Sequence, residues 1–275
     1  MKISNLDIIR STLRAYRASI LLPSLTSKIG LILRPFDAVR YIEVSYLLKF
    51  LRTNNLYNLN VLDVSSPHII SYILSAENIV LKTNLDESEK RFIKENHNLS
   101  FAIEDATHLT IPNNTFDLTC SVSVIEHIYR SYEMAIIEML RVTKPGGYVY
   151  ITFPVSKKYT EEWSEDTFYT NQFTDGEKTF FQYRFDHKYV SRIIDTSLQN
   201  SATLINVDIF WEKKEGTYNK MISSLQSNTL PIIAMIKNIL LNFYYGITLF
   251  NRTGEHNFSK AKEFGNIQII FKKNA

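Results

Sequence analysis

Between residues 57 and 155, short apolar runs alternate with helix-like stretches, and this alternation constrains the fold more than any other feature of the chain. Strands are predicted at residues 59–64, 78–85, 99–104, 116–124 and 148–153. Helices are predicted between them, at residues 68–76, 87–94 and 132–142. Strands and helices that alternate at this spacing are typical of an α/β domain built on a parallel sheet.

Local signals predict where these elements begin and end. Ser66 precedes Pro67 and is expected to cap the helix 68–76. The run Lys144-Pro145-Gly146-Gly147 is expected to end the helix 132–142 and to turn the chain tightly into the strand 148–153.

The rest of the chain adds helices, two strands and two inserts. Residues 1–56 have helical spacing and are predicted to form an N-terminal helical segment, which leaves residues 57–275 as the main domain. Strands at 202–211 and 265–272 bring the predicted total to seven, and Asp186 is expected to cap a helix that runs to Leu198.

The first insert, residues 156–186, is polar and aromatic, and a loop of this length is typical of a lid over a binding site or of a packed cap. The second insert, residues 212–264, has an apolar centre at 230–250. Because Lys237 interrupts that centre, an amphipathic helix that packs on the domain or lies in a membrane interface is favoured over a membrane span.

Composition excludes several classes of protein. The formal net charge of +3 is too small to indicate a nucleic-acid-binding face. The single cysteine, Cys120, excludes an internal disulfide and a multi-cysteine metal site, and it fits a reducing compartment. Charges are spread through the first nineteen residues, so no signal peptide is expected. We therefore expect a cytoplasmic protein, with peripheral membrane contact through residues 230–250 as an open alternative.

Five motifs in order resemble one known family. They are Val61-Leu62-Asp63-Val64, residues 104–112 (EDATHLTIP), Phe116-Asp117-Leu118, residues 121–128 (SVSVIEHI) and residues 139–147 (MLRVTKPGG). Together they resemble the class I S-adenosylmethionine-dependent methyltransferases, in the broad group that methylates small molecules. The resemblance covers about residues 57–155 and implies a Rossmann-like sheet of seven strands, mostly parallel with the last antiparallel, flanked by helices. It also implies S-adenosylmethionine as the cofactor.

The resemblance assigns roles to residues that follow the strands. As cofactor-binding residues it implies Asp63, Ser65, Ser66, Asn84, Asp105, Ala106 and Ser121. The family's first loop is D-x-G-x-G-x-G, whereas residues 63–69 here are DVSSPHI, without a glycine. Asn84 stands where the family usually has an acid for the ribose hydroxyls. No metal site is expected.

Several of these residues have a second interpretation that involves no ligand. Asp63 is also a typical strand-end acid that accepts bonds from loop amides, and Asp105 is also a typical turn residue. His127 is the best candidate for a general base, because histidine titrates near neutral pH, but it can equally shape the cleft without removing a proton. His187 and Tyr159 are weaker candidates near the first insert.

The sequence therefore predicts methyl transfer to a small molecule, with an acceptor that has an apolar or aromatic part. A catalytically inactive relative that serves as a binding or scaffolding module is the main alternative, because the first loop lacks glycine. A nicotinamide-dependent oxidoreductase would require G-x-G-x-x-G after the first strand, and the sequence has no such run. The acceptor and the oligomeric state are not predicted.

Overall fold

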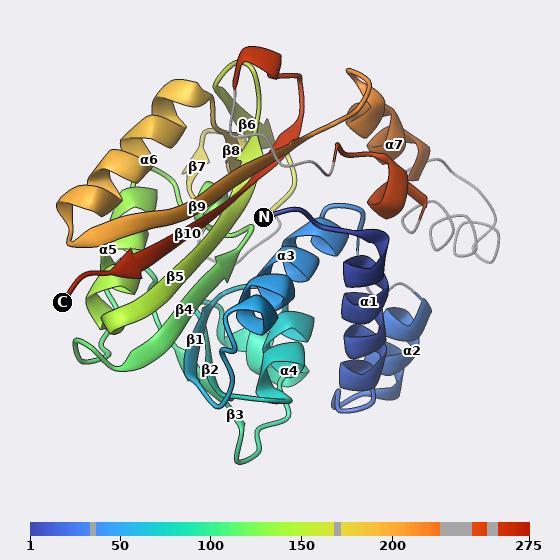
Figure 1. Ribbon diagram of the computed structural model, residues 1–275. Coiled ribbons are helices and arrows are strands. Elements are labelled where there is room, and N and C mark those ends of the chain that lie inside the picture. The colour runs from blue at the N-terminus through green and yellow to red at the C-terminus, as the bar shows by residue number, and fades with distance from the viewer. Residues whose placement is uncertain (34–36, 168–171, 226–243, 252–257) are drawn as a thin grey trace.

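A computed structural model describes residues 1–33, 37–167, 172–225, 244–251 and 258–275. Its centre is a seven-stranded sheet with helices on both faces (Figure 1). The strands follow the order β3-β2-β1-β4-β5-β10-β9. They comprise β1 (Asn60–Val64), β2 (Ile79–Asn84), β3 (Leu99–Ile103), β4 (Phe116–Val122), β5 (Thr143–Val155), β9 (Ala202–Trp211) and β10 (Gly265–Lys273).

The pairing of these strands confirms the predicted fold class. Strands β1 to β5 pair in parallel, whereas β10 is antiparallel to both β5 and β9. The carboxyl ends of the five parallel strands consequently meet along one edge of the sheet, where ligands bind in open α/β sheets.

Helices cover the two faces of the sheet separately. One face carries α1 (Asn5–Ser19), α3 (Arg40–Thr53) and α4 (His68–Ser75), and the other carries α5 (Tyr132–Val142) and α6 (His187–Gln199) (Figure 1). Side chains alternate between these faces along each strand. Val61 belongs to the core beside α3 and α4, for example, and the next residue, Leu62, belongs to the core beside α5.

Three helices form the N-terminal part of the chain, α1, α2 (Leu25–Leu33) and α3. Ser4 caps α1 through its hydroxyl, which accepts a bond from the Asp7 amide at 3.3 Å. Helix α3 is an integral part of the core, since Tyr41, Tyr46 and Leu47 are almost completely buried against the sheet. The predicted boundary at residue 56 stays a prediction.

The first insert is a small sheet, whereas the sequence suggested a loop. Strands β6 (Thr160–Ser164), β8 (Lys178–Arg184) and β7 (Thr174–Asp175) pair antiparallel in that order. Phe180 and Tyr183 of β8 are buried against the main domain, which is why an aromatic-rich segment can form strands here.

One local prediction was wrong, and a second was confirmed only in part, since α5 ends at Val142 as expected. Pro67, not Ser66, is the N-cap residue of α4, and the Ser66 hydroxyl instead accepts a bond from the Val122 amide at 3.0 Å. Residues 144–147 form part of β5, which begins directly after α5, and Gly146 has a φ of +79° where the strand is irregular.

Two other predicted helices are present, one of them as a different type of helix. The predicted helix at 87–94 is a 3₁₀ helix, η1 (Glu87–Phe92). Helix α6 begins as expected, because the Asp186 carboxylate accepts a bond from the Tyr189 amide at 3.2 Å.

The second insert is described in part, with α7 (Thr217–Leu225), a short helical stretch at residues 244–248, and the 3₁₀ helix η3 (Phe258–Lys260). Most of the apolar stretch 230–250 lies outside the described residues. At its end, Leu249 and Phe250 are buried in the core beside α3. Among the described residues, no helix combines the length and the apolar character needed to cross a bilayer.

Candidate functional site

A cleft of about 950 Å³ opens at the carboxyl ends of the parallel strands. Its volume lies near the top of the range of about 300–1,000 Å³ that is usual for small-molecule sites. The strand-end wall of this cleft, as we name it, consists of Ser65, Ser66, Asn84, Asp105 and Ala106. A second set of lining residues does not come from the strand ends, and we name it the cap wall. It comprises Arg40, His127, Tyr129, Gln172 and Phe173.

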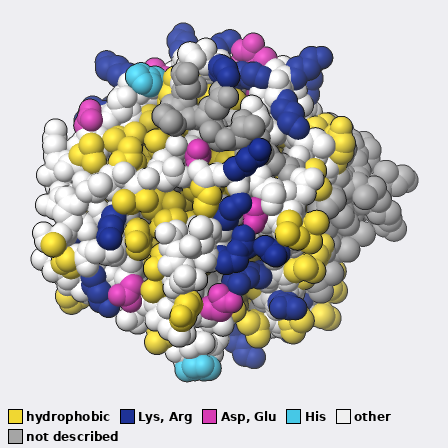
Figure 2. Space-filling model, in the orientation of Figure 1, with side chains coloured by type: hydrophobic (Ala, Val, Ile, Leu, Met, Phe, Trp, Pro, Cys, Tyr) yellow, Lys and Arg dark blue, Asp and Glu magenta, His cyan; other side chains and the backbone are white. Residues whose placement is uncertain are grey.

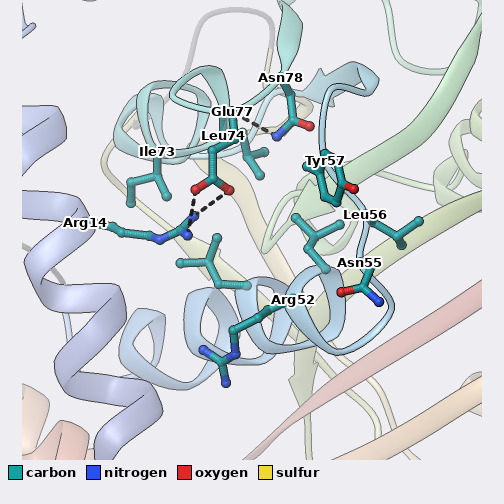
Figure 3. Close-up of a pocket in the computed structure, with 11 residues that line it drawn as sticks. Arg14, Arg52, Asn55, Leu56, Tyr57, Ile73, Leu74, Glu77 and Asn78 are labelled. Carbon is teal, nitrogen blue, oxygen red and sulfur yellow. Dashed lines mark hydrogen bonds and ion pairs between the residues drawn. The ribbon is translucent and has the colours of Figure 1, made fainter.

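A second, smaller pocket of about 220 Å³ lies between α1, α3 and α4, away from the strand ends. Figure 3 shows Arg14 of α1 pointing across it to Glu77, which follows α4. Two bonds of 3.1 and 2.9 Å join these side chains. This pocket contains none of the residues that the sequence assigned to the site.

The loop after β1 is built around a buried ion pair. Asp63 and Lys82 are both completely buried, and their charged atoms lie 3.7 Å apart. The Asp63 carboxylate also accepts bonds from the Ser66 amide at 3.2 Å and from the Ser71 hydroxyl. The Lys82 ammonium donates to the Ser66 carbonyl. Asp63 therefore stabilises the loop through buried bonds, as expected of a strand-end acid that accepts bonds from loop amides. It does not line the cleft.

Ser65 takes the backbone conformation that usually requires glycine. Its φ is +56°, in the left-handed region where a side chain costs about 1–2 kcal/mol. The loop thus turns tightly without a glycine, because Asp63 and Lys82 bond to Ser66 on one side of Ser65 and Ser121 bonds to Val64 on the other. The chain keeps a turn in the place of the family's glycine-rich loop.

Asn84, Asp105 and Ala106 meet in the cleft from the ends of β2 and β3. The Asn84 side-chain oxygen accepts a bond from the Asp86 amide at 2.9 Å, which directs the side chain at the strand end. One Asp105 carboxylate oxygen accepts bonds from the amide and the hydroxyl of Thr107, at 2.8 and 2.7 Å. The turn role of Asp105 is therefore present, and the same residue borders the cleft.

Ser121 does not line the cleft. Its side chain is completely buried, and its hydroxyl donates to the Val64 carbonyl at 3.2 Å. This bond ties the end of β4 to the end of β1 and leaves Ser121 in a supporting position. Tyr159 and His187 also lie outside the lining of the cleft.

His127 borders the cleft in a defined tautomer. Its Nδ1 lies 2.6 Å from the Phe181 carbonyl, which can only accept, so Nδ1 carries the proton. Burial lowers the pKa of His127 to about 4, against the bond to Phe181, which raises it. The ring is consequently neutral at pH 7, with the lone pair on Nε2, 3.9 Å from the Glu126 carboxyl.

Arg40 enters the cleft from the N-terminal helices through a buried polar network. The Ser123 hydroxyl lies 2.5 Å from the Arg40 guanidinium and 2.6 Å from the Glu43 carboxylate. Glu43 is completely buried and also accepts bonds from Thr152 and Asn266 at 2.7 and 2.9 Å. Burial opposes the charge on Arg40, but Glu43 and Asp37 outweigh it and raise the pKa of the guanidinium.

Glu126 is a buried carboxyl beside this network, and its Oε2 has no hydrogen-bond partner. Burial raises its pKa to about 8, although the charge on Arg40 lowers it. The group is therefore mostly protonated at pH 7. Its ionisation adds a second negative charge close to Glu43.

An aromatic cluster supports the cap wall. Tyr129 stacks on Phe173 with ring centroids 4.2 Å apart, and Trp163 and Phe180 pack edge-on or tilted against them. Phe173 is 42% exposed, whereas Phe180 is almost fully buried. The described residues of the insert thus form mainly a packed cap, in which the exposed ring of Phe173 lines the cleft.

Sequence reasoning missed most of the cap wall. Arg40 lies far from the motifs, and no pattern in residues 1–56 marks it. Gln172 and Phe173 belong to an insert whose strands have no fixed spacing from the motifs. Lys82 did have a signal, because a lysine in the middle of a predicted buried strand is unusual and requires a partner.

The described residues contain no group of three or more His, Cys, Asp or Glu side chains arranged to hold a metal ion. Cys120 is completely buried in β4, and burial raises the pKa of its thiol well above the usual value. A thiol in that state is a poor nucleophile.

Comparisons with known proteins agree with this architecture. A family model described as a methyltransferase domain matches residues 70–151. An uncharacterized methyltransferase of Schizosaccharomyces pombe is 31% identical over 121 residues, which cover 38% of this chain and 42% of that protein. The chain therefore spans less than half the length of this curated relative.

Two solved structures show the same fold at low identity. Coclaurine N-methyltransferase, bound to N-methylheliamine and S-adenosylhomocysteine, is 14% identical with a TM-score of 0.52, over 84% of this chain and 72% of its own. The [4+2]-cyclase SpnF is 13% identical with a TM-score of 0.50, over 84% of this chain and 82% of its own. One fold thus carries two different activities in these proteins.

Proposed function

The chain belongs to the class I S-adenosylmethionine-dependent methyltransferase family, and from this premise we propose that it transfers a methyl group to a small molecule with an apolar or aromatic part. The observation that supports the proposal most is the cleft itself. It lies at the strand ends, where this fold binds ligands, and its volume suits a nucleoside-sized cofactor together with an acceptor.

The strand-end wall fits the cofactor that the family implies. Ser65 provides a left-handed turn, so the loop backbone passes close to the cleft as a glycine loop would. Asn84 offers an amide to the ribose hydroxyls, and Asp105 offers a carboxylate to the adenine amino group. Ala106 would pack beside the adenine ring. We propose supporting roles for Asp63 and Ser121, which hold the loop and the end of β4.

Bound S-adenosylmethionine would supply an electrophilic methyl group on a sulfonium. The protein's own task is then to hold the acceptor in line with that methyl group and to exclude water. Phe173 and Tyr129 of the cap wall offer ring surfaces to an apolar or aromatic acceptor.

His127 is the proposed proton acceptor where the acceptor must lose a proton. Its neutral ring and its Nε2 lone pair have the correct form at pH 7. A pKa of about 4 makes it a weak base, so positioning is the larger contribution to the rate. Under this proposal, replacing His127 lowers the rate and leaves cofactor binding unchanged.

The alternative is a binding or scaffolding module without chemistry. The glycine-free loop and the neutral Asn84 at the end of β2 favour it. In that case the cleft would bind neither S-adenosylmethionine nor S-adenosylhomocysteine. The proposed location is the cytoplasm, and any membrane contact of residues 230–250 is likewise a proposal.

Calorimetric titration with S-adenosylmethionine and with S-adenosylhomocysteine tests the proposal. We expect micromolar binding of both, weakened about fivefold or more in Asp105→Ala, which removes one hydrogen-bond acceptor. Asp195→Ala, at an exposed site on α6, is the control and should bind like the wild type. A folded wild-type protein that binds neither compound would contradict the proposed enzyme.

A further inference from the structure

Helix α1 has most of its large apolar side chains on the outside, with Ile8 as the buried exception. Leu6, Ile9, Leu13 and Tyr16 follow helical spacing, and they are 52%, 49%, 53% and 37% exposed. Amphipathic helices of globular proteins normally turn such a stripe toward the core. In Figure 2, hydrophobic side chains lie over the part of the surface formed by α1, next to a cluster of Lys and Arg.

Polar contacts explain why this orientation is stable. Apart from Ile8, the buried side chains of α1 are small or polar, and the Ser11 and Ser45 hydroxyls lie 2.6 Å apart. The buried Asp7 carboxylate pairs with Lys49 at 2.9 Å and with Arg52 at 2.6 Å. These bonds fix α1 against α3, so the apolar stripe cannot turn inward without breaking them.

The exposed apolar surface continues beyond α1. Ile20 and Leu21 follow the helix and are 66% and 48% exposed, and Leu25 and Ile29 of α2 are 72% and 48% exposed. We name these eight side chains, from Leu6 to Ile29, the outer apolar face. Among the described residues, about half of the exposed large hydrophobic side chains belong to it, and the others are scattered over the remaining elements.

Charge on this part of the chain is one-sided. Residues 1–33 contain five Lys or Arg and one acid, Asp7, which is buried, so they carry +4 where the whole chain carries +3. On the helical wheel, Arg10 and Arg17 lie directly beside the apolar stripe, and both are exposed. An apolar stripe flanked by cations, without an exposed acid in α1 or α2, is typical of helices that lie in a lipid interface.

We propose that the outer apolar face docks onto an anionic phospholipid bilayer, with Leu6, Ile9 and Leu13 in the acyl boundary and Arg10 and Arg17 against the headgroup phosphates. This surface is formed by side chains between residues 6 and 29, and the proposal does not depend on the proposed enzymatic function. The face consists of the stripe of α1 and its continuation into α2. A second copy of the chain fits less well, because it would bring another segment with a net charge of +4 against this one.

Vesicle co-sedimentation of the full chain tests the proposal. We expect binding to phosphatidylcholine vesicles that contain phosphatidylglycerol, and much weaker binding to pure phosphatidylcholine, since the cations require anionic headgroups. Leu13→Glu should weaken binding about tenfold or more, because it places a charge in the apolar stripe. Leu198→Glu is the matched control, because Leu198 on α6 is 42% exposed and lies outside the face.

A second pair of variants tests the contribution of the arginines to vesicle binding. Arg10→Glu/Arg17→Glu should abolish the preference for phosphatidylglycerol, whereas Lys188→Glu on α6 should keep it. Circular dichroism and the mass in solution are measured for each variant. The proposal is overturned if the wild type ignores anionic vesicles or if Leu13→Glu binds them like the wild type. A wild-type dimer that Leu13→Glu converts to a monomer, with no vesicle binding, would overturn it in favour of a contact between two copies.

Discussion

The two walls of the cleft differ in origin. The strand-end wall comes from consecutive strands of one parallel sheet, and its side chains follow from where each strand ends. The cap wall gathers Arg40 from α3, His127 and Tyr129 from the segment after β4, and Phe173 from the inserted sheet. The same sheet can therefore keep its strand-end wall while the residues of the cap wall change. Under the proposed function, the strand-end wall would bind the cofactor and the cap wall would determine the acceptor.

The largest expected effect concerns the buried ion pair of Asp63 and Lys82, which fixes the loop after β1. Lys82→Met leaves the Asp63 carboxylate buried without its cation, so we expect a loss of about 3–5 kcal/mol in the free energy of unfolding. Lys144→Met is the matched control. The pair of Lys144 with Asp117 is partly exposed, and its loss should cost about 1 kcal/mol or less. Urea denaturation measures both, and equal losses would show that the buried pair has no special role.

An effect that reaches a similar size only over several pH units concerns the Glu126 carboxyl, next to the cap wall. Because the pKa of Glu126 is raised from 4.5 to about 8, the folded protein keeps this proton between those pH values, where the unfolded chain has lost it. The wild type should therefore lose stability relative to Glu126→Gln as the pH rises from 4.5 to about 8. The slope should be on the order of 1 kcal/mol per pH unit. Urea denaturation across this range measures it, and a difference that is constant with pH would contradict the raised pKa.

The smallest effect concerns the turn at Ser65. Ser65→Gly removes the cost of a left-handed side chain but makes the unfolded chain more flexible, so we expect a change between zero and a gain of about 1 kcal/mol. Ser100→Gly in β3 is the control and should lose about 0.5–1 kcal/mol, because a strand gains nothing from glycine. If Ser65→Gly loses as much as Ser100→Gly, the turn is not strained.

The sequence predicted the sheet well and placed the residues of the strand-end wall at the strand ends, for a physical reason, whereas their binding of a cofactor stays a prediction. Buried parallel strands are continuous apolar runs, and the residue types that follow them are limited by the turns they form. The places of Asn84, Asp105 and Ala106 in the cleft follow from that regularity. Asp63 and Ser121 were predicted as ligand residues, but their side chains are buried and bond to the ends of neighbouring strands.

Most of the cap wall could not be predicted from the sequence, because its residues are positioned by contacts between distant parts of the chain. Arg40 lies beside Glu43, one turn further along α3, and Glu43 is anchored by Ser123, which follows β4, by Thr152 of β5 and by Asn266 of β10. Such a network depends on contacts between residues far apart in the chain, which no local pattern records. The outer apolar face of α1 is similar, since periodicity alone would have turned it inward.

Titration of S-adenosylhomocysteine into one variant of each wall shows which wall binds the cofactor. We expect Asn84→Ala/Asp105→Ala to weaken binding more than tenfold, because two hydrogen bonds are removed, and Phe173→Ala to stay within about threefold of the wild type. The reverse result, or an equal loss in both variants, would contradict a cleft in which the strand-end wall holds the cofactor and the cap wall does not.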